Sequence, residues 1–305
     1  MNKLGGALAG LTAASIWGGM YVVSKVVLDV IPPFALVSLR LLMAIAVLGF
    51  VAWRQGGLHL NREQWRTTIG VGLVGYGISL GLQFVGTKLS TAANGALVTS
   101  ASPAFIFLFA ALLLREQLTL PRLAALLLAT VGVLVVIDPR AASLARDALW
   151  GNLALFGAAL TWGLYSVLVK RAVRDLSTLQ FSFVSMIGGL PICLPAALVE
   201  LRSTQIGPIT PGVVGGLLFL GIISTALAMY LWNKSFELLD AGVAALFFFA
   251  QPVVGAGLGW WLLREHLSAG FFWGGTLIAL SLALAAWPSK RIAHPLVMET
   301  VEGQG

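Results

Sequence analysis

The chain has 305 residues, of which 58% are hydrophobic and only 10% charged, and its mean hydropathy is +0.93. Soluble domains carry roughly 25% charged residues. This composition therefore excludes an ordinary soluble domain and indicates that lipid surrounds the protein. The net charge of +7 does not indicate nucleic-acid binding, because the 19 basic residues are scattered singly between apolar segments. A single cysteine, Cys193, excludes a disulfide framework and a Cys/His metal site.

Windows of about 20 apolar residues predict ten transmembrane helices. The predicted spans are residues 7–27, 33–53, 67–87, 93–114, 119–138, 150–169, 179–199, 211–232, 243–263 and 271–287. The first is longer than a typical signal-peptide core, and we expect it to be retained as a helix. The connections between spans are short, so no soluble domain is inserted.

The positive charges predict the orientation of the chain. With the N-terminus in the cytoplasm, twelve basic residues lie inside: Lys3, Arg54, Arg62, Arg66, Arg115, Arg122, Lys170, Arg171, Arg174, Lys234, Lys290 and Arg291. Six lie outside: Lys25, Lys88, Arg140, Arg146, Arg202 and Arg264. This excess predicts a multi-pass protein of the bacterial inner membrane with both termini in the cytoplasm.

An internal repeat relates the two halves of the chain. A shift of 145 residues pairs Trp17, Gly18 and Lys25 with Trp162, Gly163 and Lys170. A shift of 149 residues pairs Pro103 and the Leu-Leu-Arg-Glu string at 113–116 with Pro252 and the same string at 262–265.

Each repeat holds five helices, an odd number, so the second repeat must enter the membrane with reversed polarity. We therefore expect an all-α membrane protein with one repeat at 1–140, an inverted repeat at 148–288 and a cytoplasmic tail at 289–305. Inverted repeats suit alternating access around a site at the bilayer midplane. The alternative is a duplication that only built a stable bundle.

Trp17-Gly18 in the first span, Arg40 in the second, Pro103 in the fourth and the Leu-Leu-Arg-Glu string, echoed in the second half, resemble the drug/metabolite transporter superfamily. Within it they are similar to the ten-helix EamA type, over residues 5–288. The resemblance implies an exporter of amino acids, other metabolites or drugs. It extends to amino-acid exporters of the YddG type, for which the sequence offers no substrate-specific motif.

Two prolines mark a predicted interruption in each half. Pro103 and Pro252 lie near the middle of their spans, where proline disrupts the hydrogen bond to the carbonyl four residues earlier, here Thr99 and Phe248. Paired interruptions in corresponding helices of an inverted repeat indicate a binding site, with the prolines as hinges. A purely mechanical kink is the alternative.

Aromatic and uncharged polar side chains complete the predicted substrate site. Trp17 and Tyr21 share a helix face, and Trp162 with Tyr165 or Ser166 forms a similar cluster. Further positions are Tyr76, Ser79 and Gln83 on the third span, Asn94, Thr99, Ser100 and Ser102 on the fourth, Ser224, Thr225 and Tyr230 on the eighth, and Phe248 and Gln251 on the ninth. Such a set suits a small zwitterionic or polar-aromatic solute. Alternatively, the rings pack against neighbouring helices or lipid, and the hydroxyls bond to their own backbone.

Arg40 is the one charged residue well inside a predicted span, where burial is costly unless it faces an interior or aqueous cavity. It has no basic counterpart in the repeat, because the shift of 145 residues pairs it with Ser185. Two hypotheses remain. Arg40 binds a substrate carboxylate, or it caps backbone carbonyls or extends toward the headgroups.

The middle of the predicted spans holds no Asp, Glu or His, so the sequence predicts no intramembrane proton relay, catalytic group, metal site or cofactor. We therefore expect a monomeric, non-enzymatic carrier whose partners are lipid and a small-molecule substrate. It is expected to export small organic metabolites, above all amino acids, with aromatic or large neutral ones as one option, by facilitated diffusion or exchange. Alternatives are export of drugs or of nucleoside-type or sugar-type metabolites, a receptor role, and an intramembrane enzyme.

Overall fold

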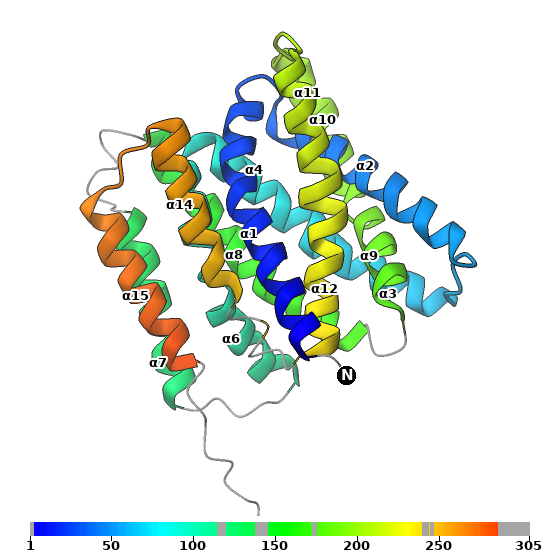
Figure 1. Ribbon diagram of the computed structural model, residues 1–305, viewed down its shortest axis with the longest axis horizontal. Helices are drawn as coiled ribbons and strands as arrows, with labels where there is room; N and C mark the ends of the chain where they lie inside the picture. The colour runs from blue at the N-terminus through cyan, green and yellow to red at the C-terminus, as the bar shows by residue number, and fades with distance from the viewer. Residues whose placement is uncertain are drawn as a thin grey trace, which may run out of the picture.

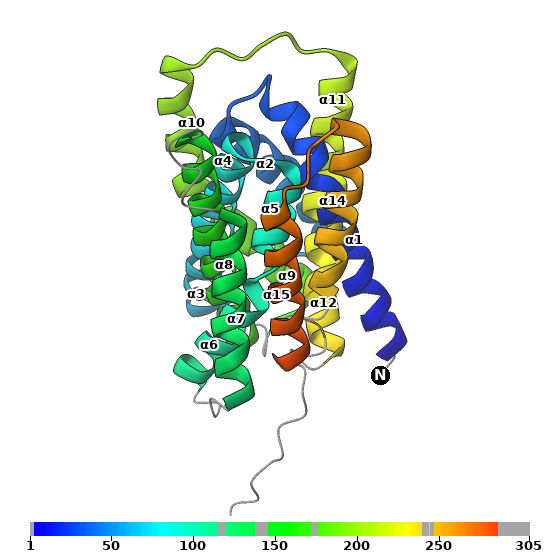
Figure 2. The ribbon, with the colours of Figure 1, turned by 90° about the vertical axis from the view of Figure 1, so that its left-hand side faces the viewer.

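The structure is a computed structural model that describes residues 3–114, 120–137, 146–172, 176–239, 244 and 247–285. Every regular element in these ranges is a helix, and the helices pack side by side as one bundle (Figures 1 and 2). The predicted cytoplasmic tail, 289–305, lies outside the described residues.

The first part of the chain forms the helices before residue 138. They are α1 (Lys3–Leu28), α2 (Pro33–Arg54), α3 (Arg62–Gly72), the π-helical η1 (Leu73–Ser79), α4 (Leu80–Leu89), α5 (Ala92–Thr99), α6 (Ser102–Leu114) and α7 (Leu120–Ile137). α3, η1 and α4 follow one another directly, so they form one long helix with a π-helical segment in the middle.

The second part forms the helices after residue 145. They are α8 (Arg146–Ala172), α9 (Thr178–Ile187), α10 (Leu190–Ser203), α11 (Pro211–Leu218), the π-helical η4 (Phe219–Leu227), α12 (Ala228–Leu238), the short 3-10 helix η5 (Phe247–Phe249), α14 (Ala250–Leu263) and α15 (Ala269–Ala285). The π-helical η4 again lies in the middle of a long helix.

Seven helices of the described residues are long and apolar enough to cross a membrane. They are Lys3–Leu28, Pro33–Arg54, Arg62–Leu89, Ala92–Leu113, Asp147–Val169, Thr178–Ser203 and Pro211–Leu238. Each coincides with one predicted span. The three other predicted spans fall on the shorter helices α7, α14 and α15. The protein is therefore a multi-pass helical membrane protein, and its tenfold crossing stays a prediction.

Two central helices have matching surroundings. α1 lies between α12 and α14, and α8 packs against α4 and α6 (Figure 1). A glycine after each tryptophan permits close approach: a Cβ added to Gly18 would lie 2.8 Å from the carbonyl oxygen of Gln251, and one added to Gly163 would lie 2.6 Å from Cβ of Phe105. Both distances are shorter than carbon contacts allow, so larger residues would force these helices apart.

Carboxylates from the second part of the chain cap two helices of the first part. Glu200 accepts hydrogen bonds from the backbone N–H groups of Phe34 and Ala35, at the start of α2. Glu265 accepts them from Ala92 at 2.7 Å and Ala93 at 2.9 Å, at the start of α5. The first N–H groups of a helix lack partners within the helix and favour negative charge. The caps therefore fix α2 and α5 against the second part.

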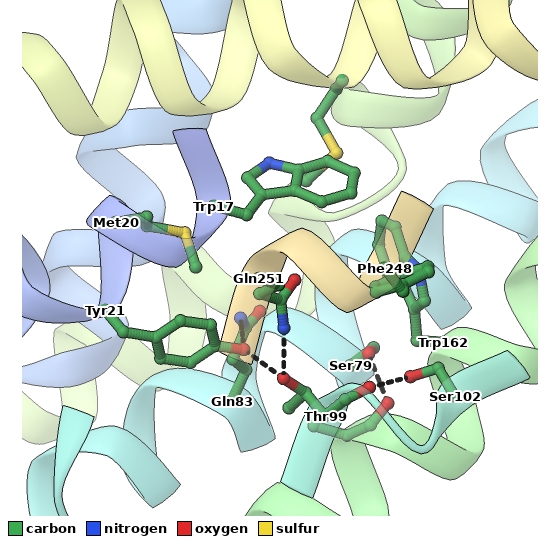
Figure 3. A pocket seen from close by; sticks show the side chains of 12 residues that line it. Trp17, Met20, Tyr21, Ser79, Gln83, Thr99, Ser102, Trp162, Phe248 and Gln251 are labelled. Carbon is green, nitrogen blue, oxygen red and sulfur yellow. Dashed lines mark hydrogen bonds between the residues drawn. The ribbon is translucent and has the colours of Figure 1, made fainter. Parts of the chain in front are cut away.

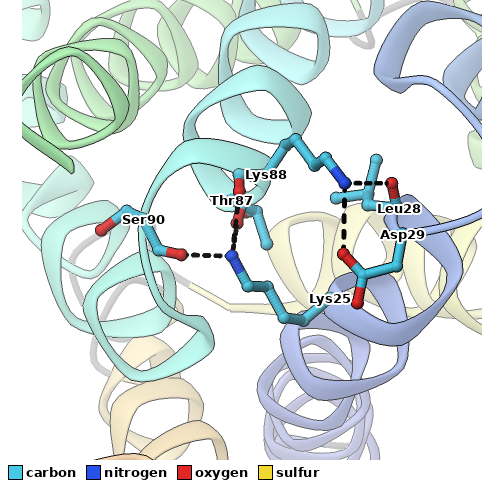
Figure 4. A network of polar contacts seen from close by, with 6 residues as sticks. All are labelled: Lys25, Leu28, Asp29, Thr87, Lys88 and Ser90. Carbon is cyan, nitrogen blue, oxygen red and sulfur yellow. Dashed lines mark hydrogen bonds and ion pairs between the residues drawn. The ribbon is translucent and has the colours of Figure 1, made fainter. Parts of the chain in front are cut away.

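Lys25 and Lys88 cap helix C-termini, and each caps the helix that carries the other lysine (Figure 4). Lys25 of α1 donates to the carbonyls of Lys88 at 2.9 Å and Ser90 at 2.5 Å, at the end of α4. Lys88 donates to the carbonyl of Leu28, at the end of α1, and forms an ion pair with Asp29 at 3.1 Å. Cations are favourable at helix C-termini. This exchange holds the ends of α1 and α4 together.

The regular α-helix is broken near both prolines. α5 ends at Thr99 and α6 begins at Ser102, one residue before Pro103. The carbonyl of Thr99 instead accepts a hydrogen bond of 2.6 Å from the Ser102 hydroxyl. In the second part, the 3-10 helix η5 precedes α14, and Pro252 is the third residue of α14. The role of the prolines as hinges stays a prediction.

Candidate functional site

A small cavity lies at the centre of the bundle, where α1, α8 and the interrupted helices meet (Figure 3). It is lined by Trp17, Met20, Tyr21, Ser79, Gln83, Thr99, Ser102, Ala158, Trp162, Met229, Phe248 and Gln251. Its volume is about 30 Å³, which is room for one or two waters. Small-molecule sites measure roughly 300 Å³ or more, so a solute enters only when the walls move.

Aromatic rings form one wall of the cavity, and Trp17 is at their centre. Its ring centroid lies 5.8 Å from that of Trp162, in an edge-on arrangement, and 5.2 Å from that of Trp232. Phe248 is 6.1 Å from Trp17 and 4.6 Å from Trp232. Aromatic pairs at these separations stabilise one another beyond their buried area. Trp17, Trp162 and Phe248 therefore give the cavity an apolar wall, and Trp232 packs on Trp17 and Phe248 without lining it.

A chain of uncharged polar groups forms the opposite wall (Figure 3). Gln83 donates to the Tyr21 hydroxyl at 2.5 Å, and that hydroxyl lies 2.6 Å from Oγ1 of Thr99. Thr99 donates to the carbonyl of Gly95, so the Tyr21 hydroxyl is the donor to Thr99. Gln251 donates to the same Thr99 oxygen at 2.7 Å. This network links α4, α1, α5 and α14.

The two tryptophans differ in what their indole N–H groups do. Nε1 of Trp17 donates to the backbone carbonyl of Ser224 at 3.1 Å. Nε1 of Trp162 is buried and has no hydrogen-bond partner within the described structure. Every other side-chain donor lining the cavity donates to an acceptor in the protein. A buried donor without a partner is costly, so the N–H group of Trp162 is open to an acceptor that the described residues do not supply.

The structure brings most of the predicted substrate-binding residues together. Those lining the cavity are Trp17, Tyr21, Ser79, Gln83, Thr99, Trp162, Phe248 and Gln251. Ser102, which the sequence offers as a hydrogen-bonding group, also lines it. Met20, Ala158 and Met229 are lining residues that sequence reasoning missed. Met20 had a signal, because it lies three residues after Trp17 on the same helix face.

Four predicted substrate-binding residues lie away from the cavity lining. The Tyr76 hydroxyl is 3.0 Å from that of Tyr165. The backbone N–H of Asn94 donates to the side chain of Thr91, which caps the start of α5, and the side-chain amide of Asn94 faces Ser90. Ser166 donates to the carbonyl of Trp162, four residues earlier, and Tyr230 packs against the apolar core.

The displacement of Tyr76 has a physical reason. The spacing of Tyr76, Ser79 and Gln83 predicts one polar face for an α-helix, but Leu73–Ser79 is π-helical. The i→i+5 bonds of a π-helix widen the turn. A residue inside the π-helical segment, such as Tyr76, therefore no longer shares the face that α-helical spacing predicts with Gln83, which follows the segment. Ser79 and Gln83 reach the cavity, and Tyr76 does not.

Arg40 is fully buried and lies behind the cavity wall. Its Nε donates to the Thr225 hydroxyl at 2.7 Å and its Nη2 to the Ser224 hydroxyl at 3.2 Å, and its guanidinium lies 4.5 Å above the centre of the Phe84 ring. It neither extends to the headgroups nor has a backbone carbonyl among these partners. No carboxylate of the described residues is among them either.

No acidic or basic side chain is among the residues that line the cavity. Across the described ranges, His, Cys, Asp and Glu side chains do not gather in groups of three or more as metal ligands would. The residues that line the cavity therefore offer shape, ring stacking and hydrogen bonds. The fold and this site define a multi-pass helical membrane protein with a small central cavity.

The model of the EamA-like transporter family matches residues 4–138 and again 149–287, so the chain belongs to this family. Among its relatives, the uncharacterized transporter YetK of Bacillus subtilis is 30% identical over 287 residues, which are 90% of this chain and 84% of that protein. A "probable amino-acid metabolite efflux pump" of Salmonella typhimurium is 28% identical, over 92% of this chain and 94% of its own. One solved structure, described only as the crystal structure of a protein, is 25% identical with a TM-score of 0.68, over 95% of this chain and 100% of that chain.

Proposed function

We propose that this protein is a carrier that exports small organic metabolites, above all aromatic or large neutral amino acids, by alternating access around the central cavity. The observation that carries the proposal is the cavity itself. It joins a wall of aromatic rings to a wall of uncharged hydrogen-bonding groups, and this combination suits an apolar side chain next to polar backbone groups. The relatives named as amino-acid metabolite efflux pumps support this substrate class.

The carrier crosses the membrane ten times in this proposal, as two inverted five-helix repeats. Four observations support it: the paired motifs of the sequence, the two matches to one family model, the π-helical segments η1 and η4 in corresponding long helices, and an interruption beside each proline. The start of α1 and the end of α15 also lie at the same end of the bundle (Figures 1 and 2). Both termini then lie on one side of the membrane, and the excess of positive charge supports the cytoplasm as that side.

Transport runs down the substrate gradient or by exchange, and a monomer suffices for it. The cavity holds no carboxylate or histidine that could carry a proton through the membrane. Collapsing the pH gradient across the membrane, with the substrate gradient held constant, is therefore expected to leave the transport rate unchanged. Strict loss of transport under that treatment would contradict the proposed energy source.

Counterflow in proteoliposomes tests the function. Vesicles holding the purified protein are loaded with unlabelled L-phenylalanine, and uptake of trace labelled L-phenylalanine is followed, with empty liposomes as the control. The expected result is a transient, saturable accumulation of label that excess L-leucine or L-tryptophan suppresses. A pore would give flux without accumulation. Counterflow with nucleosides or drugs, but not with any amino acid, would overturn the substrate class.

A further inference from the structure

Arg40 carries a hydrogen-bonding group that the protein itself does not use. Its Nε and Nη2 have hydroxyl partners on Thr225 and Ser224, but Nη1 is buried and has no partner within the described structure. The residue is 0% exposed, so water at the surface of the protein does not reach this nitrogen either. A buried donor on a charged group is costly when it is left without an acceptor.

Two contacts place the guanidinium directly behind the cavity wall. Nη2 of Arg40 lies 3.5 Å from the sulfur of Met20, and Met20 lines the cavity. Ser224 accepts from Arg40 through its hydroxyl and from Trp17 through its carbonyl, and Trp17 also lines the cavity. Arg40 and the cavity are therefore separated by a single layer of side chains.

The layer between them contains a side chain that can move. Met20 is unbranched and has three rotatable bonds, so it can change rotamer with little disturbance of α1. Its sulfur is only a weak acceptor and is a poor partner for a guanidinium. The contact between Met20 and Arg40 therefore fills the space without satisfying the charge.

The positive charge of Arg40 also has no counter-ion among the described residues. The groups that contact it are two hydroxyls, one thioether and one phenyl ring, and none of them carries a negative charge. The ion pairs of the described residues, Lys88 with Asp29 and Lys234 with Glu237, lie at helix ends. Buried cations are normally paired, because the cost of removing them from water is otherwise not recovered.

We propose that Arg40 binds the carboxylate of the transported solute when Met20 turns aside, so that the carrier selects solutes with a carboxylate. This inference rests on the proposed function. A carboxylate is planar and matches the fork of guanidinium N–H groups, which a hydroxyl or amide does not. It supplies both the missing acceptor for Nη1 and the missing negative charge. The aromatic wall at Trp17 and Trp162 then receives the side chain of the solute.

Competition against counterflow of labelled L-phenylalanine tests the selection. The two competitors are unlabelled L-phenylalanine and L-phenylalaninamide, which keeps the ring and the amine but lacks the carboxylate. For the wild-type protein, the amide is expected to need a concentration roughly 10- to 100-fold higher for half inhibition, as the loss of hydrogen bonds to a charged group implies. Arg40→Gln is expected to remove most of this preference by weakening the binding of L-phenylalanine.

The matched control is Arg54→Gln, which removes an exposed arginine from the end of the same helix, α2, and is expected to keep the preference. Thermal unfolding of each purified variant reports on folding. Met20→Ile provides a second variant that leaves Arg40 in place. Its β-branched side chain is stiff at χ1, so it is expected to hinder access to Arg40 and to reduce the preference as well.

The outcomes separate the two claims. If Arg40→Gln and Met20→Ile both exchange L-phenylalanine with the wild-type preference over the amide, the role of Arg40 is overturned and the carrier function stands. If the wild-type protein exchanges L-phenylalanine but is inhibited equally by unlabelled L-phenylalanine and L-phenylalaninamide, the selection for a carboxylate is overturned. If the wild-type protein exchanges no amino acid, the proposed function itself fails.

Discussion

The helices α1 and α8 use the same pair of residues in different ways. Each carries a Trp-Gly pair, and each glycine packs against an interrupted helix: Gly18 against α14 and Gly163 against α6. The indole of Trp17 is bonded to the backbone of η4, whereas the indole N–H of Trp162 has no partner within the described structure. The packing is thus duplicated between the two helices, and the polar chemistry is not.

In the function proposed above, this difference would let two similar halves of the chain hold an asymmetric solute. An amino acid has a charged end and a side chain, so two identical half-sites could not bind it equally well. Here α1 supplies a fixed ring and the hydroxyl of Tyr21, and α8 supplies a free donor. Arg40 extends the asymmetry, because its counterpart Ser185 carries no charge and donates to the carbonyl of Ser182 in its own helix.

The largest effect is expected from breaking what the two helices share. Gly18→Ala and Gly163→Ala each place a methyl group 2.6–2.8 Å from an atom of the facing helix, so each is expected to lower the free energy of unfolding by about 1–3 kcal/mol. Thermal unfolding in detergent, followed by size-exclusion chromatography, measures the loss.

Gly19→Ala is the matched control for these glycines. A Cβ at this position would meet only Cδ1 of Leu258, at 3.7 Å, which is an ordinary contact. Stability close to that of the wild-type protein is expected. If Gly163→Ala were as stable as Gly19→Ala while Gly18→Ala was not, the packing of α1 and α8 would not be equivalent.

An intermediate effect, different in kind for the two helices, is expected from the tryptophans. Trp162→Phe removes the free donor and is expected to weaken L-phenylalanine binding roughly 10-fold, with a smaller loss of stability than Trp17→Phe. Trp17→Phe breaks the hydrogen bond to Ser224 and shrinks a ring that packs against three others. It is expected to cost about 1–2 kcal/mol of stability. Counterflow and thermal unfolding measure the two effects on the same preparations.

A shape-preserving control separates the hydrogen bond of Trp162 from the volume of its ring. Replacing Trp162 by benzothienylalanine, in which sulfur takes the place of the N–H group, removes only the donor. We expect this variant to bind L-phenylalanine as weakly as Trp162→Phe. Wild-type binding by the benzothienyl variant would show that the free N–H group contributes nothing to recognition.

The smallest effects are expected one turn further along the same helices. The shift of 145 residues pairs Tyr21 with Ser166. Tyr21→Phe removes a hydroxyl that bonds to Gln83 and Thr99 and is expected to cost about 0.5–1 kcal/mol of stability. Ser166→Ala removes only a bond within α8, so a change below about 0.5 kcal/mol and unaltered counterflow are expected. Equal effects of the two variants would contradict the asymmetry.

Much of the fold follows from the sequence, because long apolar segments between charges have few other structures available in lipid. The positions of α1, α2 and α8 agree with the predicted spans for this reason. The π-helical segments η1 and η4 were not predicted, since their hydrogen-bond pattern has no signature in residue type. For the same reason, the position of Tyr76 away from the cavity was not predicted.

The site was predictable where rare residue types stood out. Trp17 and Trp162 interrupt apolar spans away from the headgroup zone, and both line the cavity. Met20 and Met229 were missed because methionine in a membrane helix looks like any other apolar residue. Ser166 was predicted to bind substrate, but its hydroxyl donates to the carbonyl of Trp162 in its own helix. A hydroxyl inside a helix can do either, and only the structure shows which it does.

The most direct test of alternating access reports on both ends of the cavity at once. Thr87 and Ser235 are buried small residues near opposite ends of α1: Lys25 donates to the carbonyl of Thr87, and a Cβ added to Gly10 would lie 2.7 Å from the Ser235 hydroxyl. Thr87→Cys and Ser235→Cys are each made in a Cys193→Ala protein, which removes the one native cysteine. Each is labelled in proteoliposomes with a membrane-impermeant maleimide, with and without L-phenylalanine.

Each cysteine is expected to react from its own side of the membrane only, and L-phenylalanine is expected to change the two labelling rates in opposite directions. Rates that rise and fall together, or labelling of both positions from both sides, would contradict a carrier that opens one end of its cavity at a time.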